Sequence, residues 1–202
     1  MAEYYDETRK ADERCLGEAL DWLLGQLPRE DFGNVFEPGI GNGRIAIPLA
    51  QRGYRVTGMD ISGEMLRSAR AKLGARAQLA QADACTFDGM QSFGTAQFDR
   101  IILSYAISMI PDWQAALATA ARHLAPGGQL HVVDFGNQSG LPGWFRRGLL
   151  GWLAKFHVTP RGDLAEVLAE IGARQHCAVS YSQRLRGYAQ HAVLTKTRKM
   201  TG

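Results

Sequence analysis

Short apolar segments alternate with segments of helical periodicity along most of the chain. The apolar segments are nearly continuous, as in Ile101-Ile102-Leu103 and Leu130-His131-Val132-Val133, which is typical of parallel strands that helices cover on both faces. Strands are predicted at 34–37, 54–59, 76–81, 98–104, 129–135, 176–182 and 189–197, and helices at 8–27, 43–52, 62–73, 112–124, 143–156 and 160–171. This alternation predicts an α/β fold with a doubly wound, mostly parallel seven-stranded sheet and a helical insert after the fifth strand.

The length and composition fit one domain over residues 1–202, with an N-terminal helical cap at 1–28 and the helical insert at 138–158. A net charge of +3, from 23 basic and 20 acidic residues, gives no strong field for nucleic acid. The three cysteines are far apart and form no C-x-x-C pair, so neither a disulfide framework nor a metal site is expected. No apolar signal segment or run of about 18 residues is present, which predicts a cytoplasmic protein.

The segment 35–44, with the sequence V-F-E-P-G-I-G-N-G-R, is the most distinctive in the chain. It predicts a strand that ends at the Glu37 carboxylate and leads into a glycine-rich turn and a helix. Gly39, Gly41 and Gly43 allow positive φ angles and let a ligand lie close to the main chain. Because the following helix begins with unpaired N–H groups, a nucleotide-like ligand is expected at this turn.

The residues around the turn indicate which nucleotide binds. Dinucleotide folds use G-x-G-x-x-G and place a pyrophosphate on the helix N-terminus, whereas here the spacing is G-x-G-x-G and Arg44 occupies the third glycine position. Glu37 would repel a pyrophosphate and attract an ammonium group. Asp60, about 20 residues on, is placed to accept hydrogen bonds from ribose hydroxyls. S-adenosylmethionine has a ribose, a cationic amino-acid end and no phosphate, so it fits better than a nicotinamide dinucleotide.

The chain resembles the class I S-adenosylmethionine-dependent methyltransferases over residues 30–197. The landmarks that carry this resemblance are E-P-G-I-G-N-G (37–43), G-M-D-I-S (58–62), A-Q-A-D-A (80–84), F-D-R-I-I-L-S-Y-A (98–106) and L-A-P-G-G-Q-L (124–130). Their order and spacing match the family. The resemblance implies a Rossmann-like methyltransferase fold, an enzyme that transfers methyl groups, and S-adenosylmethionine as its cofactor.

The resemblance also implies roles for the residues at the strand ends. Glu37 would take the cofactor's ammonium group, although a strand-end carboxylate can also cap the next helix. Asp60 would bind the ribose, although it can also cap the helix that opens at residue 62. Asp83 would accept a hydrogen bond from the adenine amino group, Ala84 would offer a backbone donor, and Ile61 would pack on the adenine face.

Ser104, a further candidate for binding the cofactor, ends the fourth predicted strand, and Tyr105 follows it, beside the expected position of the methyl group. The N/D-P-P-Y/F motif of enzymes that methylate nucleic-acid bases is absent here, which argues against a nucleic-acid partner. Tyr105 either lines the acceptor pocket or packs against the following helix. In relatives the N-terminal segment folds over the cofactor, so Arg9 is a candidate partner of its carboxylate, the alternative being a disordered terminus. Tyr5, Tyr105 and His157 are the candidates for orienting an amine acceptor or taking its proton.

The predicted helix at 143–156 has two different sides. The side that is mostly apolar carries Phe145, Leu149, Trp152, Leu153 and Phe156, and the other side carries Arg147, Gly148, Gly151 and Lys155. Such a helix can lie on an anionic bilayer as a peripheral contact at the inner membrane face. It can equally serve as a lid that packs its apolar side on the domain.

The second half of the chain resembles the diacylglyceryl-homoserine N-methyltransferases of betaine-lipid synthesis. The similar segments are L-S-Y-A-I-S-M-I-P-D-W (103–113), V-V-D-F-G-N-Q-S-G-L-P-G-W-F (132–145), F-H-V-T-P-R (156–161), R-G-Y-A (186–189) and, near the N-terminus, Y-D-E-T-R-K (5–10). This resemblance implies methyl transfer to the amine of a lipid head group. The alternatives are a soluble small-molecule N or O acceptor, or a non-catalytic S-adenosylmethionine-binding module.

Overall fold

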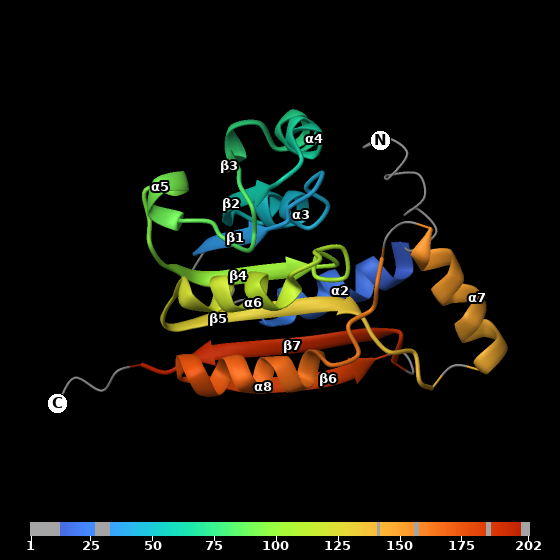
Figure 1. Ribbon diagram of the computed structural model, residues 1–202. Coiled ribbons are helices and arrows are strands. Elements are labelled where there is room, and N and C mark those ends of the chain that lie inside the picture. The colour runs from blue at the N-terminus through green and yellow to red at the C-terminus, as the bar shows by residue number, and fades with distance from the viewer. Residues whose placement is uncertain (1–12, 27–32, 141, 156–157, 185–186, 199–202) are drawn as a thin grey trace.

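The computed structural model describes residues 13–26, 33–140, 142–155, 158–184 and 187–198. Within these ranges seven strands form one sheet in the order β3-β2-β1-β4-β5-β7-β6 (Figure 1). The strands are β1 (Asn34–Pro38), β2 (Arg55–Asp60), β3 (Ala77–Gln81), β4 (Phe98–Ser104), β5 (Leu124–Phe135), β6 (Cys177–Arg184) and β7 (Ala189–Lys196). Strand β7 runs antiparallel to its neighbours β5 and β6, and the other pairs are parallel. The predicted α/β class and the mostly parallel, seven-stranded sheet are confirmed.

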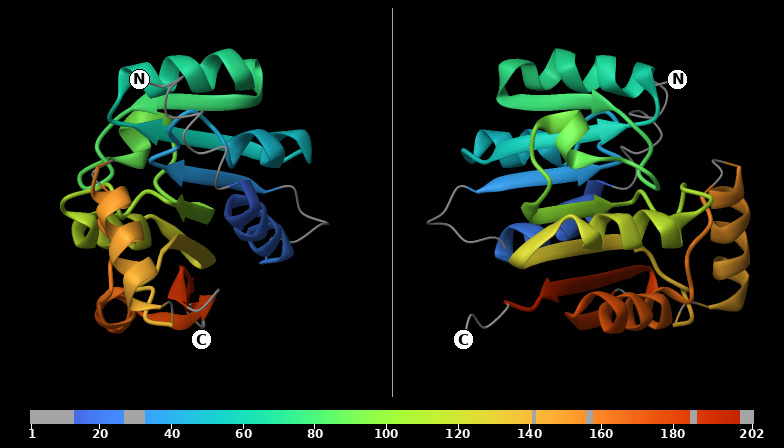
Figure 2. Two further views of the ribbon diagram at one scale, coloured as in Figure 1. Left: turned by 90° about the vertical axis from the view of Figure 1, so that its right-hand side faces the viewer. Right: turned by 60° about the vertical axis from the view of Figure 1, so that its left-hand side comes forward.

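Helices cover both faces of this sheet. They are α2 (Glu13–Gln26), α3 (Ala46–Gln51), α4 (Gly63–Leu73), α5 (Gly89–Phe93), α6 (Trp113–Arg122), α7 (Gly143–Ala154) and α8 (Leu164–Gln175). Figure 2 shows α2 and α3 on one side of the sheet and α6 and α8 on the other. None of the described helices is long and apolar enough to cross a bilayer.

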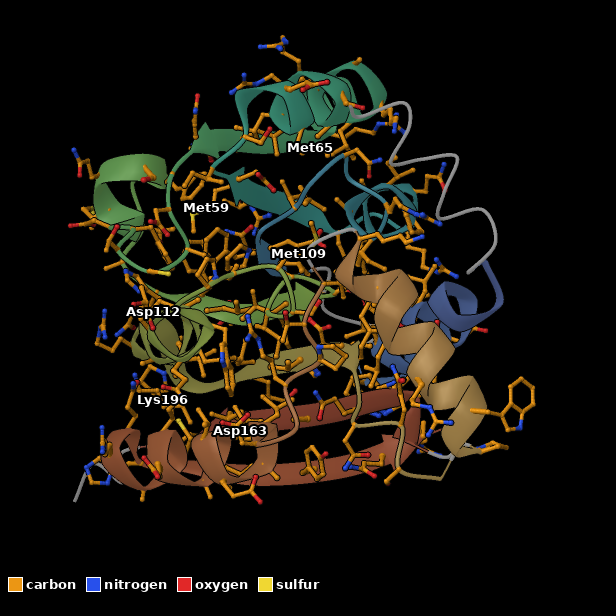
Figure 3. All side chains as sticks on the ribbon, turned by 45° about the vertical axis from the view of Figure 1, so that its right-hand side comes forward. Met59, Met65, Met109, Asp112, Asp163 and Lys196 are labelled. Atoms are coloured by element: carbon orange, nitrogen blue, oxygen red, sulfur yellow. The ribbon has the colours of Figure 1, made fainter. Side chains whose placement is uncertain are left out.

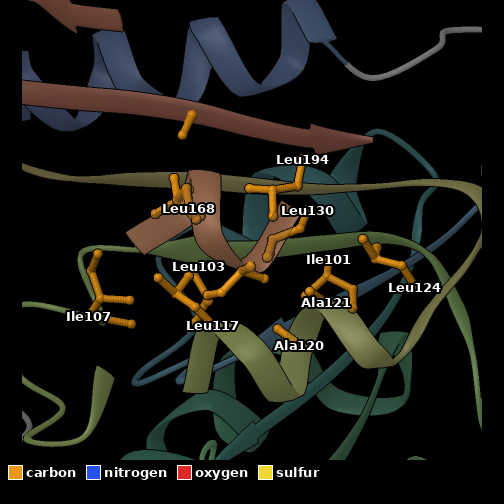
Figure 4. Close-up of a cluster of buried hydrophobic side chains, with 14 of the residues drawn as sticks. Ile101, Leu103, Ile107, Leu117, Ala120, Ala121, Leu124, Leu130, Leu168 and Leu194 are labelled. Carbon is orange, nitrogen blue, oxygen red and sulfur yellow. The ribbon is translucent and has the colours of Figure 1, made fainter. Parts of the chain in front are cut away.

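The two apolar clusters of the core lie on opposite faces of the sheet because successive strand residues point to opposite sides. In β1, Val35 contributes to the cluster under α2, α3 and α4, whereas Phe36 contributes to the cluster under α6 and α8. Figure 4 shows part of the second cluster, in which buried side chains of the two helices meet those of β4, β5 and β7; they are Leu117, Ala120, Ala121, Leu168, Ile101, Leu103, Leu130 and Leu194.

The carboxyl ends of β1 and β4 meet at the point where the strand order reverses. The chain proceeds from β1 outward to β3 on one side of the sheet, and then from β4 to the opposite edge. In such sheets ligands bind in the crevice outside these carboxyl ends. Helix α7 lies off the same end of β4 (Figure 1). The topology therefore gathers the predicted site residues at the strand ends and the helix at 143–154 on one side of the molecule.

The last helix differs in position from its prediction. It was expected at 160–171, but α8 begins at Leu164 and ends at Gln175. Residues 160–163 are not helical, and the Arg161 side chain in this connection donates to the carbonyls of Ile107 and Ile110. The helix ends at Gln175 because the following residue, His176, adopts a left-handed conformation with a φ of 55°.

Helix α2 packs on the sheet through an aromatic cluster with two histidines. The Trp22 ring centroid lies 4.5 Å from that of His191 on β7 and 6.1 Å from that of His131 on β5. His131 is fully buried and His191 is 5% exposed. Burial, together with the positive charge of Arg100, lowers the pKa of His131 to about 4. Burial and the charge of Arg184 likewise lower the pKa of His191 to about 4.

We expect these histidines to make the fold sensitive to acid. The unfolded chain protonates its imidazoles below about pH 6.5, whereas the folded protein keeps these two neutral until about pH 4. Stability is therefore complete above pH 6.5 and falls between pH 6.5 and pH 4, by about 3 kcal/mol for His131. Urea unfolding at successive pH values measures this loss.

A pair of variants isolates the contribution of His131. His131→Gln should flatten the pH dependence of the free energy of unfolding, although it lowers stability overall. The control His176→Gln changes an exposed histidine at the end of α8 and should keep the wild-type pH dependence. Equal slopes for wild type and His131→Gln would contradict the assignment.

Candidate active site

A cavity of about 590 Å³ opens at the carboxyl ends of the parallel strands. Its walls come from the glycine turn after β1, from residues 60–62 after β2, from residues 82–85 after β3 and from residues 104–106 and 109–112 at the end of β4. Figure 3 looks obliquely toward this side of the molecule and labels three lining residues, Met65, Met109 and Asp112. The cavity thus lies where the topology of the sheet predicts a ligand.

Most of the predicted site residues line this cavity. They are Glu37, Gly39, Gly41, Asp60, Ile61, Asp83, Ala84, Ser104 and Tyr105. Gly43 is not among the lining residues, and a Cβ atom built on it would lie 3.2 Å from Leu73 Cδ1 of α4. Gly43 therefore allows the turn to pack closely on α4. The other three candidates, Tyr5, Arg9 and His157, lie outside the described residues.

The glycine turn crosses over the end of β2. The N–H groups of Gly39 and Ile40 both donate to the Met59 carbonyl, at 2.8 and 2.9 Å. Gly39, Gly41 and Gly43 have φ angles of 76°, 55° and 85°, so the predicted positive-φ backbone is confirmed at all three. A Cβ atom on Gly39 would lie 3.0 Å from the Ala106 Cβ, so the missing side chain also lets the turn approach the wall after β4.

The Asp60 carboxylate joins the turn to the start of α4. Its Oδ2 accepts a hydrogen bond from Gly41 N at 2.9 Å, and its Oδ1 accepts one from Ser62 N at 2.8 Å. The N-cap of α4 is Ser62, whose Oγ accepts from Met65 N, so the alternative of Asp60 as the N-cap is wrong. A carboxylate has about four acceptor sites. Asp60 therefore keeps acceptor capacity for a ligand hydroxyl.

Glu37 is a buried carboxyl group in the cavity wall. Its side chain is 2% exposed, and within the described part of the chain its Oε2 has no hydrogen-bond partner. Burial raises the pKa of Glu37 well above its ordinary value, and the negative charge of Asp60 raises it further. The alternative role as a helix cap is wrong, because the N-cap of α3 is Ile45, with no side-chain cap. A cation in the cavity would stabilise the Glu37 carboxylate.

Residues after β2 and β3 form another part of the cavity wall. Asp83 is exposed, and its Oδ1 accepts from Cys85 N at 2.8 Å. The Ile61 side chain is 69% exposed and offers apolar surface at the cavity wall. Burial and the neighbouring Asp83 raise the pKa of Cys85 to about 11, so its thiol is neutral near pH 7.

Tyr105 lies in the cavity wall in an unusual backbone conformation. Its φ is 50°, and its N–H donates to the Val133 carbonyl at 2.7 Å. The Tyr105 ring centroid lies 4.9 Å from that of Phe135 at the end of β5. The ring is therefore fixed against β5, and it also lines the cavity.

The cavity carries an excess of negative charge. Among the described lining residues, Glu37, Asp60, Asp83 and Asp112 have carboxyl groups, whereas Arg44 is the one with a basic side chain. This balance favours a ligand with net positive charge and disfavours a pyrophosphate. No group of three or more His, Cys, Asp or Glu side chains in the described ranges is arranged to hold a metal ion.

Sequence reasoning missed part of the wall. Residues 109–112, together with Asn42, Met65 and Cys85, also line the cavity. Residues 109–112 could have been predicted to line the cavity, because they lie in the loop that follows β4, one of the two strands at which the strand order reverses.

Comparisons with known proteins agree with this geometry. Residues 35–128 match the family described as "Methyltransferase domain". The chain is 30% identical over 138 residues to a phosphatidylethanolamine N-methyltransferase of Cereibacter sphaeroides, an alignment that covers 62% of this chain and 66% of that protein. It is 34% identical over 168 residues to a ubiquinone/menaquinone biosynthesis C-methyltransferase of Paracoccus denitrificans, covering 80% of this chain and 60% of the relative. The chain thus spans somewhat less than two thirds of the length of these relatives.

Solved structures share the fold at low sequence identity. A SAM-dependent methyltransferase from Thermotoga maritima superposes with a TM-score of 0.73 at 18% identity, covering 98% of this chain and 96% of that one. Phosphoethanolamine N-methyltransferase 2 of Haemonchus contortus, in complex with S-adenosyl-L-methionine, gives a TM-score of 0.71 at 17% identity, covering 90% of this chain and 53% of that one.

Proposed function

Because the chain belongs to the class I S-adenosylmethionine-dependent methyltransferases, we propose that it transfers a methyl group from that cofactor to the amine of a lipid head group. The observation that carries this proposal is the acid-lined cavity at the strand ends, with the buried Glu37 carboxyl group in its wall. S-adenosylmethionine is the cofactor, and a cationic ligand without phosphate matches the charge of this wall.

The cavity suggests how the cofactor is oriented. Glu37 would bind the ammonium group, and Asp60 would accept hydrogen bonds from the ribose hydroxyls. Ile61 would pack on the adenine ring, with Asp83 and Ala84 at its polar edge. Ser104 and Tyr105 then lie at the end of β4, on the side left for the acceptor. This arrangement is supported by the positions of the side chains around one cavity.

Glu37 should make cofactor affinity depend on pH. Its pKa is raised in the free protein, and a bound ammonium group would lower it again, so binding should release a proton. Affinity should therefore rise with pH until Glu37 is ionised in the free protein, and fall up to about tenfold per pH unit below that point. Calorimetry between pH 5 and 7, in two buffers of different ionisation enthalpy, measures both the affinity and the proton.

Glu37→Gln is the matched variant for this measurement. It keeps the shape of the side chain, should bind the cofactor more weakly, and should show no pH-dependent proton release. If the wild type binds equally at pH 5 and 7 without releasing a proton, Glu37 does not contact the ammonium group.

In the proposed reaction the protein mainly has to align the acceptor amine with the methyl group of the cofactor. When bound, the cofactor supplies an electrophilic methyl group on a sulfonium ion. Holding an amine within about 3–3.5 Å of the methyl carbon can supply roughly 7–11 kcal/mol of the barrier. An amine whose pKa is about two units above the pH is only about 1% free base, a cost near 2.7 kcal/mol. Tyr5, Tyr105 and His157 are the proposed residues for orienting the amine or accepting its proton, and Tyr105 lines the cavity.

The lipid assignment is supported by the relatives and by helix α7. One relative is a phosphatidylethanolamine N-methyltransferase, and the second half of the chain resembles enzymes of betaine-lipid synthesis. In α7, Leu153 is buried in the core, whereas Arg147 is exposed and Trp144 is 71% exposed. The helix ends at Ala154, before the predicted end at 156, and the exposed Lys155 directly follows it. Residues 138–162 contain no Asp or Glu. We propose that this basic side of α7 forms a peripheral contact with an anionic membrane surface.

Charge reversal at Arg147 and Lys155 should greatly weaken this contact. Each Lys or Arg near an anionic surface contributes about 1 kcal/mol, so the double variant Arg147→Glu/Lys155→Glu should lose most of its flotation with phosphatidylglycerol-containing vesicles. The control Arg67→Glu/Lys72→Glu reverses two exposed charges on α4 and should float like the wild type. If both double variants float equally with the vesicles, α7 does not form the membrane contact.

The proposed reaction is tested with radiolabelled cofactor. The chain is incubated with vesicles that contain diacylglyceryl-homoserine and, separately, with a soluble amine extract. Label in the lipid fraction supports the proposal, and label only in the soluble fraction makes the acceptor a small molecule. Cofactor binding without transfer to either fraction would make the chain a binding module and contradict the enzymatic function.

A further inference from the structure

The cavity wall after β4 is a loop, residues 105–112, that belongs to no strand or helix. Residues 105–112 contain a single helical turn, in which the N–H groups of Met109 and Ile110 donate to the Ala106 carbonyl at 3.0 and 3.2 Å. All but Ile107 and Ser108 of this loop line the cavity. Its position decides the shape of the cavity on the side that the proposed cofactor orientation leaves for the acceptor.

The connection between α7 and α8 binds three carbonyl groups of this turn. Thr159 N donates to the Ser108 carbonyl at 2.9 Å. The Arg161 guanidinium donates through Nε to the Ile107 carbonyl at 3.1 Å and through Nη2 to the Ile110 carbonyl at 2.8 Å. Hydrogen bonds from a charged donor are stronger than neutral ones, and the planar fork fixes both carbonyls at once.

Arg161 is itself held in place by the rest of the fold. Its guanidinium carbon lies 5.7 Å from the centroid of the Trp113 ring, within the range of a cation–π contact. Its carbonyl accepts from Gln190 Nε2 at 2.9 Å, and the same amide donates to the Phe135 carbonyl at 2.8 Å. Gln190 is fully buried on β7. The guanidinium therefore acts from a fixed point on the sheet.

We propose that Arg161 is a positioning residue that sets the acceptor side of the cavity. It joins the loop at 105–112 to the segment that follows α7, and Val158 N in that segment donates to the Leu153 carbonyl of α7 at 3.1 Å. The acceptor wall and the helix proposed to meet the membrane are thus connected by one short stretch of chain. This inference rests on the proposed methyl transfer to a lipid amine.

The cofactor side of the cavity is held by other contacts. Glu37 and Asp60 lie on β1 and β2, and Asp60 is fixed by hydrogen bonds with Gly41 and Ser62. Neither of these two hydrogen bonds involves Arg161. Loss of the guanidinium should therefore affect the acceptor and spare the cofactor.

The test uses Arg161→Ala, Arg161→Lys and the control Arg174→Ala. Arg174 is a 79% exposed arginine on α8 that pairs with Glu170 at 3.7 Å. Hydrogen exchange at Met109, Ile110 and Thr159 reports the loop directly. Cofactor Kd comes from calorimetry, and kcat and KM come from methyl transfer to diacylglyceryl-homoserine in phosphatidylglycerol-containing vesicles at saturating cofactor.

In Arg161→Ala we expect exchange at the three amides to accelerate at least tenfold, and kcat/KM for the lipid amine to fall about 10- to 100-fold. Cofactor Kd should stay within about threefold of wild type, because the hydrogen bonds that hold Asp60 do not involve Arg161. Arg161→Lys should recover only part of the loss, since an ammonium group cannot bind both carbonyls in a fixed plane. Arg174→Ala should match the wild type.

Wild-type exchange rates in Arg161→Ala would overturn the proposal, and so would a cofactor Kd that weakens as much as kcat/KM falls. Full recovery by Arg161→Lys would also contradict the role of the guanidinium fork. If the wild type transfers no methyl group to the lipid amine, the proposed function fails. In that case unchanged cofactor Kd with faster exchange in Arg161→Ala still supports the positioning of this wall, so the two failures are distinguishable.

Discussion

Asp60→Ala is expected to weaken S-adenosylmethionine binding at least about 100-fold, which corresponds to about 2.7 kcal/mol. In the wild type the Asp60 carboxylate accepts hydrogen bonds from Gly41 N at 2.9 Å and from Ser62 N at 2.8 Å. The variant removes this acceptor, and with it the proposed partner of the ribose hydroxyls. Hydrogen bonds to a charged group contribute about 1.5–3 kcal/mol each. Calorimetric titration with the cofactor measures the loss.

Asp88→Ala is the matched control for this variant. Asp88 also accepts two backbone hydrogen bonds, from Met90 N and Gln91 N at the start of α5, but it does not line the cavity. Its replacement should cost about 1 kcal/mol of stability and leave the cofactor Kd unchanged. If Asp60→Ala binds the cofactor as tightly as Asp88→Ala does, the carboxylate at the end of β2 is not part of the cofactor site.

Gly58→Ala is expected to destabilise the fold by about 1–3 kcal/mol through overpacking, and to weaken cofactor binding at the same time. Gly58 lies in β2 between Glu37 and Leu79 of the neighbouring strands. A methyl group at this position would collide with the Ile40 side chain, and its carbon would lie 3.2 Å from the Ile40 Cβ. Ile40 belongs to the glycine turn, so the collision should displace the turn from the end of β2.

A second substitution tests whether the collision is the cause. Adding Ile40→Ala to Gly58→Ala should restore part of the cofactor affinity, because the side chain that collides is removed. The control Gly25→Ala adds a methyl group that meets nothing within 4 Å, and should bind the cofactor like the wild type. Urea unfolding and calorimetry follow stability and affinity separately. A double variant that binds as weakly as Gly58→Ala would contradict this explanation.

The sheet was predictable because its strands are short, apolar and regularly spaced. Strand β4 has the predicted bounds, and β1, β2 and β3 begin or end within one residue of theirs. Local sequence is less informative where tertiary contacts fix an end. Helix α8 begins four residues later than predicted because Arg161 holds the preceding connection against a loop more than 50 residues away.

Short helices were harder to predict than the sheet. Helix α5 has only five residues and no room for a full apolar repeat, so periodicity did not indicate it. Its start is nevertheless capped by Asp88, which accepts from two backbone N–H groups. Helix α3 begins at Ala46 rather than at residue 43, because the positive φ of Gly43 is incompatible with a helix start there.

The site was predictable where it depends on the ends of parallel strands. Glu37, Asp60 and Ser104 lie at the carboxyl ends of β1, β2 and β4, and Asp83 follows β3. Parallel pairing brings these residues around one cavity. The left-handed backbone of Tyr105 has no local sequence signal, since a bulky aromatic residue rarely adopts it. The hydrogen bonds of Arg161 join segments that only the tertiary fold brings together, so no local pattern predicts them.

We propose that the cavity at the strand ends binds S-adenosylmethionine with its ammonium group at Glu37 and its ribose at Asp60. A crystal structure of the chain grown with this cofactor tests the claim directly. We expect density for the cofactor across residues 39–43, with the ribose hydroxyls within hydrogen-bond distance of the Asp60 carboxylate. An empty cavity at saturating cofactor, or a ligand bound with its amino-acid end away from Glu37, would contradict it.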